Sequence, residues 1–263
     1  MKDRALFLRQ LNAEETTKRT YGYMLSYLET VRALDEYTTQ TFLDFVRARG
    51  WANPTARLAL AALKAYLRWQ GAPHPMLDLR IPKRQSQPGR RLTLEQRDNL
   101  LQAAERTYNP ERDQAIIRVL WDTFVRSFEL TEARLDGVNL KQRELVVLTK
   151  AANGKGRQWE LKRFSPETAA ALQAWLDKHP GGERLFPLTR DGLACLFKRL
   201  GRHVGFRVSP HDFRRGGASY QVERGVPDRL VMKQGGWRSH EVFERYTIGA
   251  ELRALDKLLW TVQ

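Results

Sequence analysis

The sequence contains a single cysteine, Cys195, among its 263 residues. One thiol cannot build an internal disulfide framework, and it is too few for a cysteine-based zinc site. No run approaches the roughly 18 consecutive apolar residues of a transmembrane helix. The N-terminus, Met1-Lys2-Asp3-Arg4, also lacks the apolar stretch of a signal peptide. These absences argue against a membrane or secreted protein and favour a cytoplasmic one.

Acidic residues are scarce, because 30 Asp and Glu stand against 45 Lys and Arg. The formal charge is therefore +15 and the isoelectric point is near 10.2. An excess of this size favours a polyanionic partner, most commonly nucleic acid. Apolar residues make up 42% of the chain, so it can bury a core. We expect an intracellular globular protein that faces DNA or RNA.

The first part of the chain has helical periodicity and no alternating strand pattern. One helix, capped at Thr16 or Thr17, is predicted from apolar residues at helical spacing, namely Tyr21, Met24, Leu25, Leu28 and Val31. A second helix is predicted to begin at Asn53-Pro54 and to end at Gly71. We expect residues 1–79 to form a compact helical domain.

Residues 80–91, RIPKRQSQPGRR, hold five basic residues, two prolines, one glycine and no acidic residue. Such a composition predicts an extended linker, because like charges repel and little of it can be buried. The linker is either solvated or lies along a phosphate backbone, and the charge of the whole protein favours the second. The residues expected to contact DNA are then Lys83, Arg84, Arg90 and Arg91.

A larger, mainly helical domain with a small β element is predicted over residues 92–263. Thr93 and Gln96 form a capping box at its start. Two strand-like runs, 144–150 and 158–163, flank Asn153-Gly154 and predict a β-hairpin. Later helices are predicted after Ser165-Pro166, Thr189 and Ser209-Pro210.

Two segments in the first half of this domain carry candidate functional residues. Arg126 and Glu129 form a charged pair in apolar surroundings, and this segment taken alone favours a buried structural ion pair. Lys155 lies between Gly154 and Gly156, so its loop can approach another backbone and the ammonium can reach a phosphate. An exposed lysine in a turn is the alternative there.

Two further segments follow in the second half. His211 and Arg214 share one face near a helix N-terminus, which favours an anion. A structural histidine fits this position equally well. Trp237 and Tyr246 follow Gly235-Gly236, and composition alone favours two core aromatics here.

In this order, the four segments resemble the motifs of the tyrosine recombinases, or phage integrase family, over nearly the whole chain. That family combines a helical core-binding domain of SAM-like fold, a basic linker and a catalytic domain that is mainly α with a small β element. The residues that match its catalytic motifs are Arg126, Lys155, His211, Arg214, Trp237 and Tyr246, with Glu129 as the acidic partner of the first arginine.

Some positions depart from the family pattern. Phe124 stands where the family usually has glycine, which can alter the turn that presents Arg126. Arg215 replaces a common histidine, and Gly216-Gly217 is unusual in a helix. Trp237 stands where most members carry histidine and a minority, Cre among them, carry tryptophan. Because an indole N–H only donates, we expect it to bind a phosphate oxygen rather than move a proton.

The resemblance implies a site-specific recombinase in which Tyr246 attacks a DNA phosphodiester, giving a 3′-phosphotyrosyl enzyme and a free 5′-hydroxyl. Arg126 and Arg214 then stabilise the charge on the non-bridging oxygens. Lys155 protonates the leaving oxygen, and His211 accepts the tyrosine's proton. The covalent link conserves the bond energy, so we expect no ATP, metal or other cofactor.

The expected partners are double-stranded DNA with inverted core half-sites, a homotetramer on synapsed DNA, and accessory DNA-binding proteins, with the enzyme located at the nucleoid. The helices start close to Met1, which favours the simple Xer- or Cre-like type without an arm-binding domain. A C-terminal helix over 251–262 can dock on a neighbouring subunit or on its own domain. A type IB topoisomerase and an inactive DNA-binding relative are the alternatives.

Overall fold

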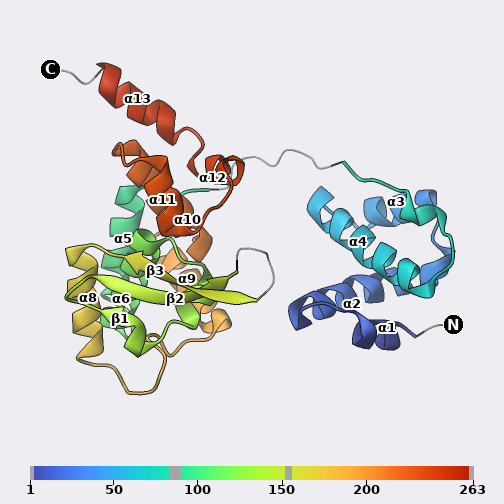
Figure 1. Ribbon diagram of the computed structural model, residues 1–263, viewed down its shortest axis with the longest axis horizontal. Helices are drawn as coiled ribbons and strands as arrows, with labels where there is room; N and C mark the ends of the chain where they lie inside the picture. Colours follow the sequence, from blue (N-terminus) through green and yellow to red (C-terminus); the bar gives the residue numbers. More distant parts are fainter. Residues whose placement is uncertain (1–2, 83–89, 152–155, 261–263) are drawn as a thin grey trace. The chain divides into compact units, whose positions relative to one another are not determined.

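The computed structural model describes residues 3–82, 90–151 and 156–260. The chain divides into two compact units, Met1–Ser86 and Gln87–Gln263 (Figure 1). This boundary lies within 80–91, the segment that the sequence predicts to be a linker. No helix in the described parts of the chain is long and apolar enough to cross a membrane.

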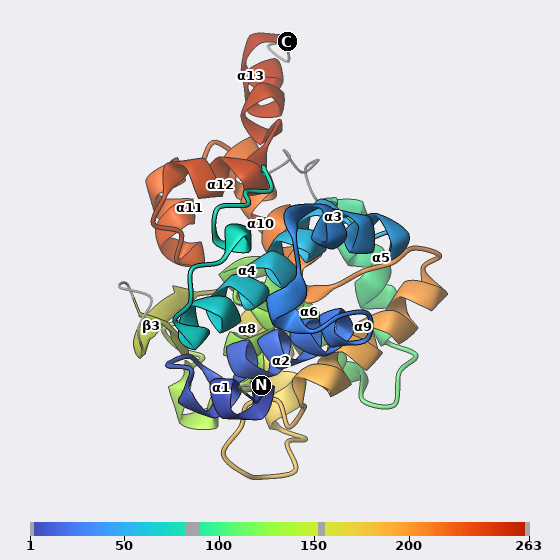
Figure 2. The same cartoon turned by 90° about the vertical axis from the view of Figure 1, so that its right-hand side faces the viewer.

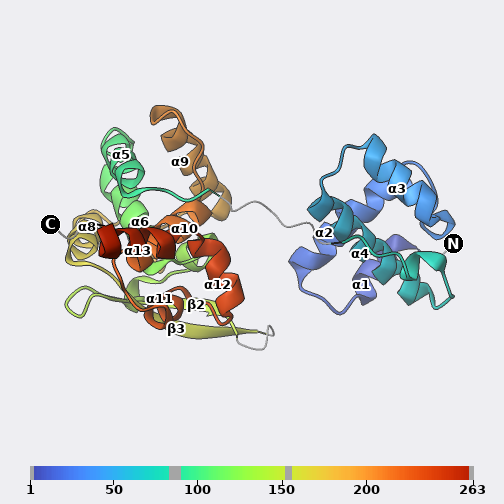
Figure 3. The same ribbon diagram turned by 90° about the horizontal axis from the view of Figure 1, so that it is seen from above.

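The N-terminal unit is built from helices around an apolar core, and α2 and α4 lie side by side in it (Figure 3). Buried aromatic and aliphatic side chains from all four α-helices fill this core, among them Phe7, Leu25, Leu28, Phe42 and Leu63. Its elements are α1 (Arg4–Gln10), α2 (Glu15–Glu29), η1 (Leu34–Glu36), α3 (Thr39–Ala48), α4 (Asn53–Gln70) and η2 (Pro75–Leu77).

The two helices expected in this unit differ in how well the sequence predicts them. Helix α4 starts and stops as predicted, with proline in its first turn and Gly71 at its C-cap. Helix α2 starts at Glu15 rather than at a threonine cap, and it ends at Glu29. Val31 therefore lies beyond the helix and is exposed, so its assignment to the apolar face is wrong. The Tyr37 hydroxyl donates to the Leu28 carbonyl at this end of the helix.

The larger unit confirms a mainly α fold with a small β element. Its three-stranded antiparallel sheet has the order β1-β2-β3, and helices pack against one face of it (Figure 1). The elements are α5 (Leu94–Ala104), α6 (Pro110–Thr123), α7 (Ser127–Thr131), η3 (Leu135–Gly137), β1 (Val138–Asn139), β2 (Glu144–Lys150), β3 (Arg157–Arg163), α8 (Pro166–Leu176), α9 (Arg190–His203), α10 (Pro210–Glu223), α11 (Asp228–Gly235), α12 (His240–Thr247) and α13 (Ala250–Trp260).

Local signals place most of these elements correctly. The Thr93–Gln96 capping box is present, and Ser165 and Thr189 cap α8 and α9 through their side chains. The register of the hairpin runs from Glu144 opposite Arg163 to Lys150 opposite Arg157. The predicted Asn153-Gly154 turn lies outside the described residues.

The larger unit has two apolar clusters, and α10 contributes to both. The main cluster includes Trp121, Phe197 and Phe213. A smaller cluster joins the end of α6 to α10, α11, α12 and the start of α13, and consists of Phe124, Ala218, Val222, Val231, Trp237, Phe243 and Ala250. The smaller cluster underlies the candidate site described below.

The glycine pair in α10 lets this helix lie very close to the end of α6. A Cβ added at Gly217 would lie 2.2 Å from the Trp121 carbonyl oxygen, and one at Gly216 would lie 2.5 Å from the Leu92 carbonyl oxygen. These contacts involve backbone atoms, so a side chain cannot move aside to make room. The close approach brings Arg214, one turn earlier in α10, next to the residue that follows α6.

Candidate active site

Arg126 stands at the N-cap of α7, and its position is fixed by a buried carboxylate. Glu129 accepts hydrogen bonds from the Arg126 backbone N–H at 2.8 Å and from Nη1 at 2.7 Å. The Glu129 side chain is 3% exposed, whereas that of Arg126 is 48% exposed. The Glu129 carboxylate is thus a buried structural group, whereas about half of the Arg126 side chain remains exposed.

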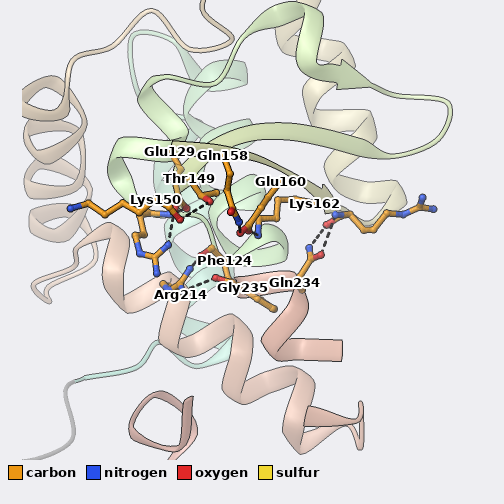
Figure 4. Close-up of polar contacts among 12 residues, drawn as sticks. Phe124, Glu129, Thr149, Lys150, Gln158, Glu160, Lys162, Arg214, Gln234 and Gly235 are labelled. Atoms are coloured by element: carbon orange, nitrogen blue, oxygen red, sulfur yellow. Dashed lines mark hydrogen bonds and ion pairs between the residues drawn. The ribbon is translucent and has the colours of Figure 1, made fainter. Parts of the chain in front are cut away.

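Arg214 is held in a different way, by backbone carbonyls. It is 1% exposed, and it donates from Nη1 to the Phe124 carbonyl and from Nη2 to the Gly235 carbonyl at 2.7 Å (Figure 4). Its guanidinium carbon lies 4.0 Å from the centroid of the Trp237 ring. Its Nε is buried and finds no hydrogen-bond acceptor among the described residues.

Tyr246, on α12, lies where the candidate residues of α10 and the Gly235–Trp237 turn meet. Its ring centroid is 5.1 Å from that of His211 and 5.0 Å from that of Trp237. The Arg214 guanidinium carbon is 5.7 Å from the centroid of the Tyr246 ring. The structure therefore brings His211, Arg214, Trp237 and Tyr246 together.

The electrostatics of this cluster favour a charged arginine and a neutral histidine. Burial, with the nearby charge of Arg126, lowers the pKa of Arg214 to about 10, so the guanidinium group stays protonated near neutral pH. Partial burial, followed by the charges of Arg215 and Arg214, lowers the pKa of His211, while Asp212 opposes the shift. Near pH 7 the His211 ring is therefore mostly uncharged and can accept a proton.

Trp237 is fixed by its contact with the glycine two residues before it. A Cβ at Gly235 would lie 1.8 Å from Trp237 Cζ3, so the indole ring lies across this backbone and only glycine fits. The indole is buried, and its Nε1–H has no acceptor within the described part of the chain. A buried donor without a partner next to Tyr246 suits an incoming oxygen.

Phe124 shows how the departure from the family's glycine is accommodated. Its φ is 54°, in the left-handed region that glycine adopts freely. A phenylalanine in this region costs about 1–3 kcal/mol. The buried Phe124 ring, 6.1 Å from the Trp237 ring, belongs to the smaller apolar cluster, and that burial offsets the cost. The turn is kept, and its carbonyl holds Arg214.

The structure does not bring every other predicted site residue into view. Lys155, Lys83 and Arg84 lie outside the described residues. Arg90 is exposed, donates to the Arg207 carbonyl at 2.7 Å and lies 4.5 Å from the Phe206 ring centroid. Arg91 forms an ion pair with Glu223 at 2.7 Å. A role of these basic residues in DNA binding stays a prediction.

Sequence reasoning missed the polar residues that surround the cluster. Lys162 is buried on β3 and pairs with Glu160 at 2.7 Å, while Trp159 and Leu161 on the opposite face are exposed (Figure 4). Burial acts to raise the pKa of Glu160, but the hydrogen bond and the charge of Lys162 outweigh it, so this pKa lies below its usual value. The alternation in residues 158–163 predicts a strand with one apolar and one polar face. Apolar faces are usually the buried ones, whereas here the face with Lys162 is buried and the face with Trp159 and Leu161 is exposed. No sequence signal marks Gln234, which contacts β3 and the end of α6.

The described residues contain no cluster of three or more His, Cys, Asp or Glu side chains suited to a metal ion.

Comparison with known proteins adds independent information. Residues 90–252 match the Phage integrase family. The chain is 28% identical over 239 residues to tyrosine recombinase XerA of Thermococcus kodakarensis, which covers 88% of this chain and 84% of that protein. XerA of Pyrococcus furiosus is 27% identical over 254 residues, or 92% and 87% of the two chains.

The fold also matches solved structures. The Tn1549 transposon integrase, in complex with a circular intermediate DNA, superimposes with a TM-score of 0.74 at 16% identity, covering 97% of this chain and 98% of that one. At this identity the likeness shows a common fold.

Proposed function

The chain belongs to the phage integrase family and is a tyrosine site-specific recombinase, and we propose that it cuts and rejoins DNA strands through a covalent 3′-phosphotyrosyl link at Tyr246. The observation that carries this mechanism is the convergence of Tyr246 with His211, Arg214 and Trp237. A tyrosine beside an uncharged imidazole and a buried guanidinium group has a proton acceptor and a phosphate-binding cation at hand.

In the cleavage step, the Tyr246 oxygen forms a bond to phosphorus and the bond from phosphorus to the 5′-oxygen breaks. The proton of the phenol passes to His211, whose lowered pKa keeps it able to accept. A phenol ordinarily loses its proton near pH 10, so transfer during attack is needed at neutral pH. Lys155 donates a proton to the leaving 5′-oxygen. Rejoining is the reverse reaction, with a 5′-hydroxyl as the nucleophile.

The two arginines stabilise the pentacovalent transition state, in which negative charge gathers on the non-bridging oxygens. Arg126 offers an outward guanidinium group held by Glu129, and Arg214 offers its free Nε–H. A fixed donor of this type is worth about 10²–10³ in rate. The Trp237 Nε1–H is a further donor that cannot itself titrate.

DNA is the proposed substrate. The net charge of +15 favours a polyanion, and the Tn1549 integrase of similar fold was solved in complex with DNA. We infer that the helical unit over residues 1–79 and the basic segment 80–91 bind DNA of the half-site. In this role Lys83, Arg84 and the exposed Arg90 contact the backbone, whereas Glu223 partly neutralises Arg91.

Helix α13 suggests how copies assemble. Its start packs on α10, where Ala250 is buried and Arg253 pairs with Glu223 at 2.6 Å. The helix nevertheless extends away from the rest of its unit (Figures 1 and 2), and Leu252 and Leu255 are exposed on it. We propose that α13 docks on a second copy within a tetramer on two DNA sites. Leu252→Glu should then abolish strand exchange between duplexes and leave cleavage of one site intact.

The test of the chemistry begins with a pool of nicked duplexes with a randomised core. A nick beside the scissile phosphate lets the short 5′-hydroxyl strand diffuse away, so covalent protein–DNA complexes accumulate and can be sequenced. Wild-type protein should form an adduct, and mass spectrometry should locate the nucleotide on Tyr246. Tyr246→Phe should form none.

Tyr108→Phe is the matched control, because Tyr108 is an exposed tyrosine of the same unit, and it should form the adduct as wild type does. Wild-type protein that binds a selected duplex and never forms an adduct would contradict the mechanism and favour an inactive DNA-binding relative. Relaxation of supercoiled plasmid without paired sites, in the absence of strand exchange, would favour a type IB topoisomerase.

A further inference from the structure

Gln234, next to last in α11, uses its side-chain amide in three hydrogen bonds to backbone atoms. Nε2 donates to the Arg163 carbonyl at 2.5 Å and to the Asp122 carbonyl at 2.9 Å. Oε1 accepts from the Arg163 N–H at 3.2 Å (Figure 4). Both donors face carbonyl oxygens and the acceptor faces an N–H, so only one orientation of the amide satisfies all three.

These bonds attach α11 to the edge of the sheet. β3 is the last strand of the order β1-β2-β3, and Arg163 is its final residue. The Gln234 amide pairs with the N–H and the C=O of Arg163, as a neighbouring strand would. The third bond reaches Asp122 near the end of α6, so one side chain joins three separate segments.

Arg214 joins two of these segments a second time. It binds the Phe124 carbonyl, two residues after Asp122, and the Gly235 carbonyl, one residue after Gln234. A guanidinium group is planar and of fixed width, so it can bind both carbonyls only if their separation is correct. The bond from Gln234 to Asp122 joins the same two segments, the end of α6 and the end of α11. Its two ends lie one or two residues from the carbonyls that bind Arg214.

We propose that Gln234 is a positioning residue for Arg214: by joining the end of α6 to the end of α11, it sets the spacing of the two carbonyls that hold the guanidinium group. Through Gly235 it also holds the Trp237 turn against β3. Gln234 is not expected to touch DNA. The inference rests on the proposed function for its effect on cleavage, but its structural part stands independently.

The chemistry of glutamine suits this role. Methionine has a similar length and no hydrogen-bonding group, so Gln234→Met removes all three bonds and keeps most of the volume. Asparagine keeps the amide on a chain one methylene shorter. Gln173→Met is the matched control, because Gln173 is exposed on α8 and, among the described residues, its side chain bonds only Asp177 at the C-cap of the same helix.

The first experiment uses the free protein and needs no DNA. The guanidinium proton signals of Arg214 are assigned by NMR with an Arg214→Lys variant, and their exchange with water is measured. Gln234→Met should speed this exchange about tenfold or more, because the two carbonyls separate, while Gln173→Met should not. Circular dichroism checks the fold, and Gln234→Asn replaces Gln234→Met if the latter is unfolded. Unchanged Arg214 protection in a folded Gln234 variant overturns the proposal.

The second experiment measures single-turnover adduct formation on a duplex selected as above. At saturating DNA, Gln234→Met should slow cleavage about 10- to 100-fold, as expected for a misplaced catalytic group, with no change in affinity for the duplex. On a duplex whose scissile phosphate carries a methyl group in place of one non-bridging oxygen, Arg214 has less charge to stabilise. The defect of the variant should therefore shrink there.

The outcomes separate the two claims. An equal defect on both duplexes means that Gln234 does not act through Arg214, and the proposal fails while the proposed function stands. Wild-type protein without any adduct contradicts the proposed function, and the exchange measurement still decides whether Gln234 positions Arg214.

Discussion

The two arginines of the site lie in two regions that are held together by different interactions. In the α6–α7 region, a buried carboxylate orients Arg126, whose own side chain is about half exposed. In the α10–α12 region, two backbone carbonyls and an indole ring enclose Arg214. The first arrangement depends on a side chain that one substitution can remove. The second depends on where three segments of backbone lie.

This difference suggests a division of work. An arginine that is half exposed and paired with one carboxylate can adjust to an incoming phosphate, because its Nη2 and Nε are not committed to Glu129. An enclosed arginine cannot adjust, so in the proposed mechanism Arg214 would define the position that the phosphate takes. Preorganised donors of the second kind give the larger electrostatic stabilisation, since no reorganisation is needed in the transition state.

The largest effect is expected from replacing each arginine by lysine. Arg214→Lys should slow adduct formation about 10³-fold, because one ammonium cannot bind both carbonyls and present a further donor. Arg126→Lys keeps a charge beside Glu129 and should slow it about 10-fold to 100-fold. Single-turnover rates at saturating duplex measure both. If Arg126→Lys proves as damaging as Arg214→Lys, the contrast between the two regions is wrong.

A smaller effect is expected at Phe124, whose backbone serves the Arg214 region. Removing the buried ring should destabilise the protein by about 3–5 kcal/mol in Phe124→Ala. Phe124→Gly should be about 1 kcal/mol more stable than Phe124→Ala, although it has fewer atoms, because glycine relieves the cost of the left-handed φ of 54°. Urea denaturation measures the free energy of unfolding of both.

Phe197 is the matched control, since it is a buried phenylalanine inside α9. There the order of the two variants should reverse, with glycine about 0.5–1 kcal/mol less stable than alanine. If the alanine variant is more stable than the glycine variant at both positions, the backbone at Phe124 is not strained.

The two regions also differ in what the sequence can predict. The helix caps at Thr93, Ser165 and Thr189 depend on hydrogen bonds within three residues, so local sequence reveals them. The prediction for Val31 is wrong because periodicity does not show where a helix ends.

Within the site, the motif spacing selects Arg126, His211, Arg214 and Tyr246, the residues whose side chains we propose to carry the chemistry. The groups that hold Arg214 leave no such trace. Every residue has a carbonyl, so nothing in the sequence distinguishes those of Phe124 and Gly235. Their role depends on the approach of α10 to α6, which requires the tertiary structure. The glycines at 216 and 217 were visible as an anomaly, but their reason is a contact with the distant backbone of Trp121.

The smallest effect is expected at His211, whose pKa is lowered by charges in both regions. After burial, the charge of Arg215 is the largest cause of its lowered pKa, followed by Arg214. Arg215→Gln should therefore raise the His211 pKa toward 6.5, its ordinary value. An NMR titration of the free protein, with His211 assigned by His211→Gln, should show this rise. Arg224→Gln is the control, because Arg224 is exposed at the C-cap of α10, and it should not change the His211 pKa.

The sign of the matching change in stability follows from proton linkage. Because the folded-state pKa of His211 lies below 6.5, the unfolded chain binds more protons between that lowered value and 6.5. The free energy of unfolding therefore falls as the pH drops through this window, and Arg215→Gln should narrow the window and lessen the fall. The acidic limb of the cleavage rate should move to higher pH by the same amount. A limb that stays in place while the NMR pKa moves would mean that His211 is not the group that accepts the proton of Tyr246.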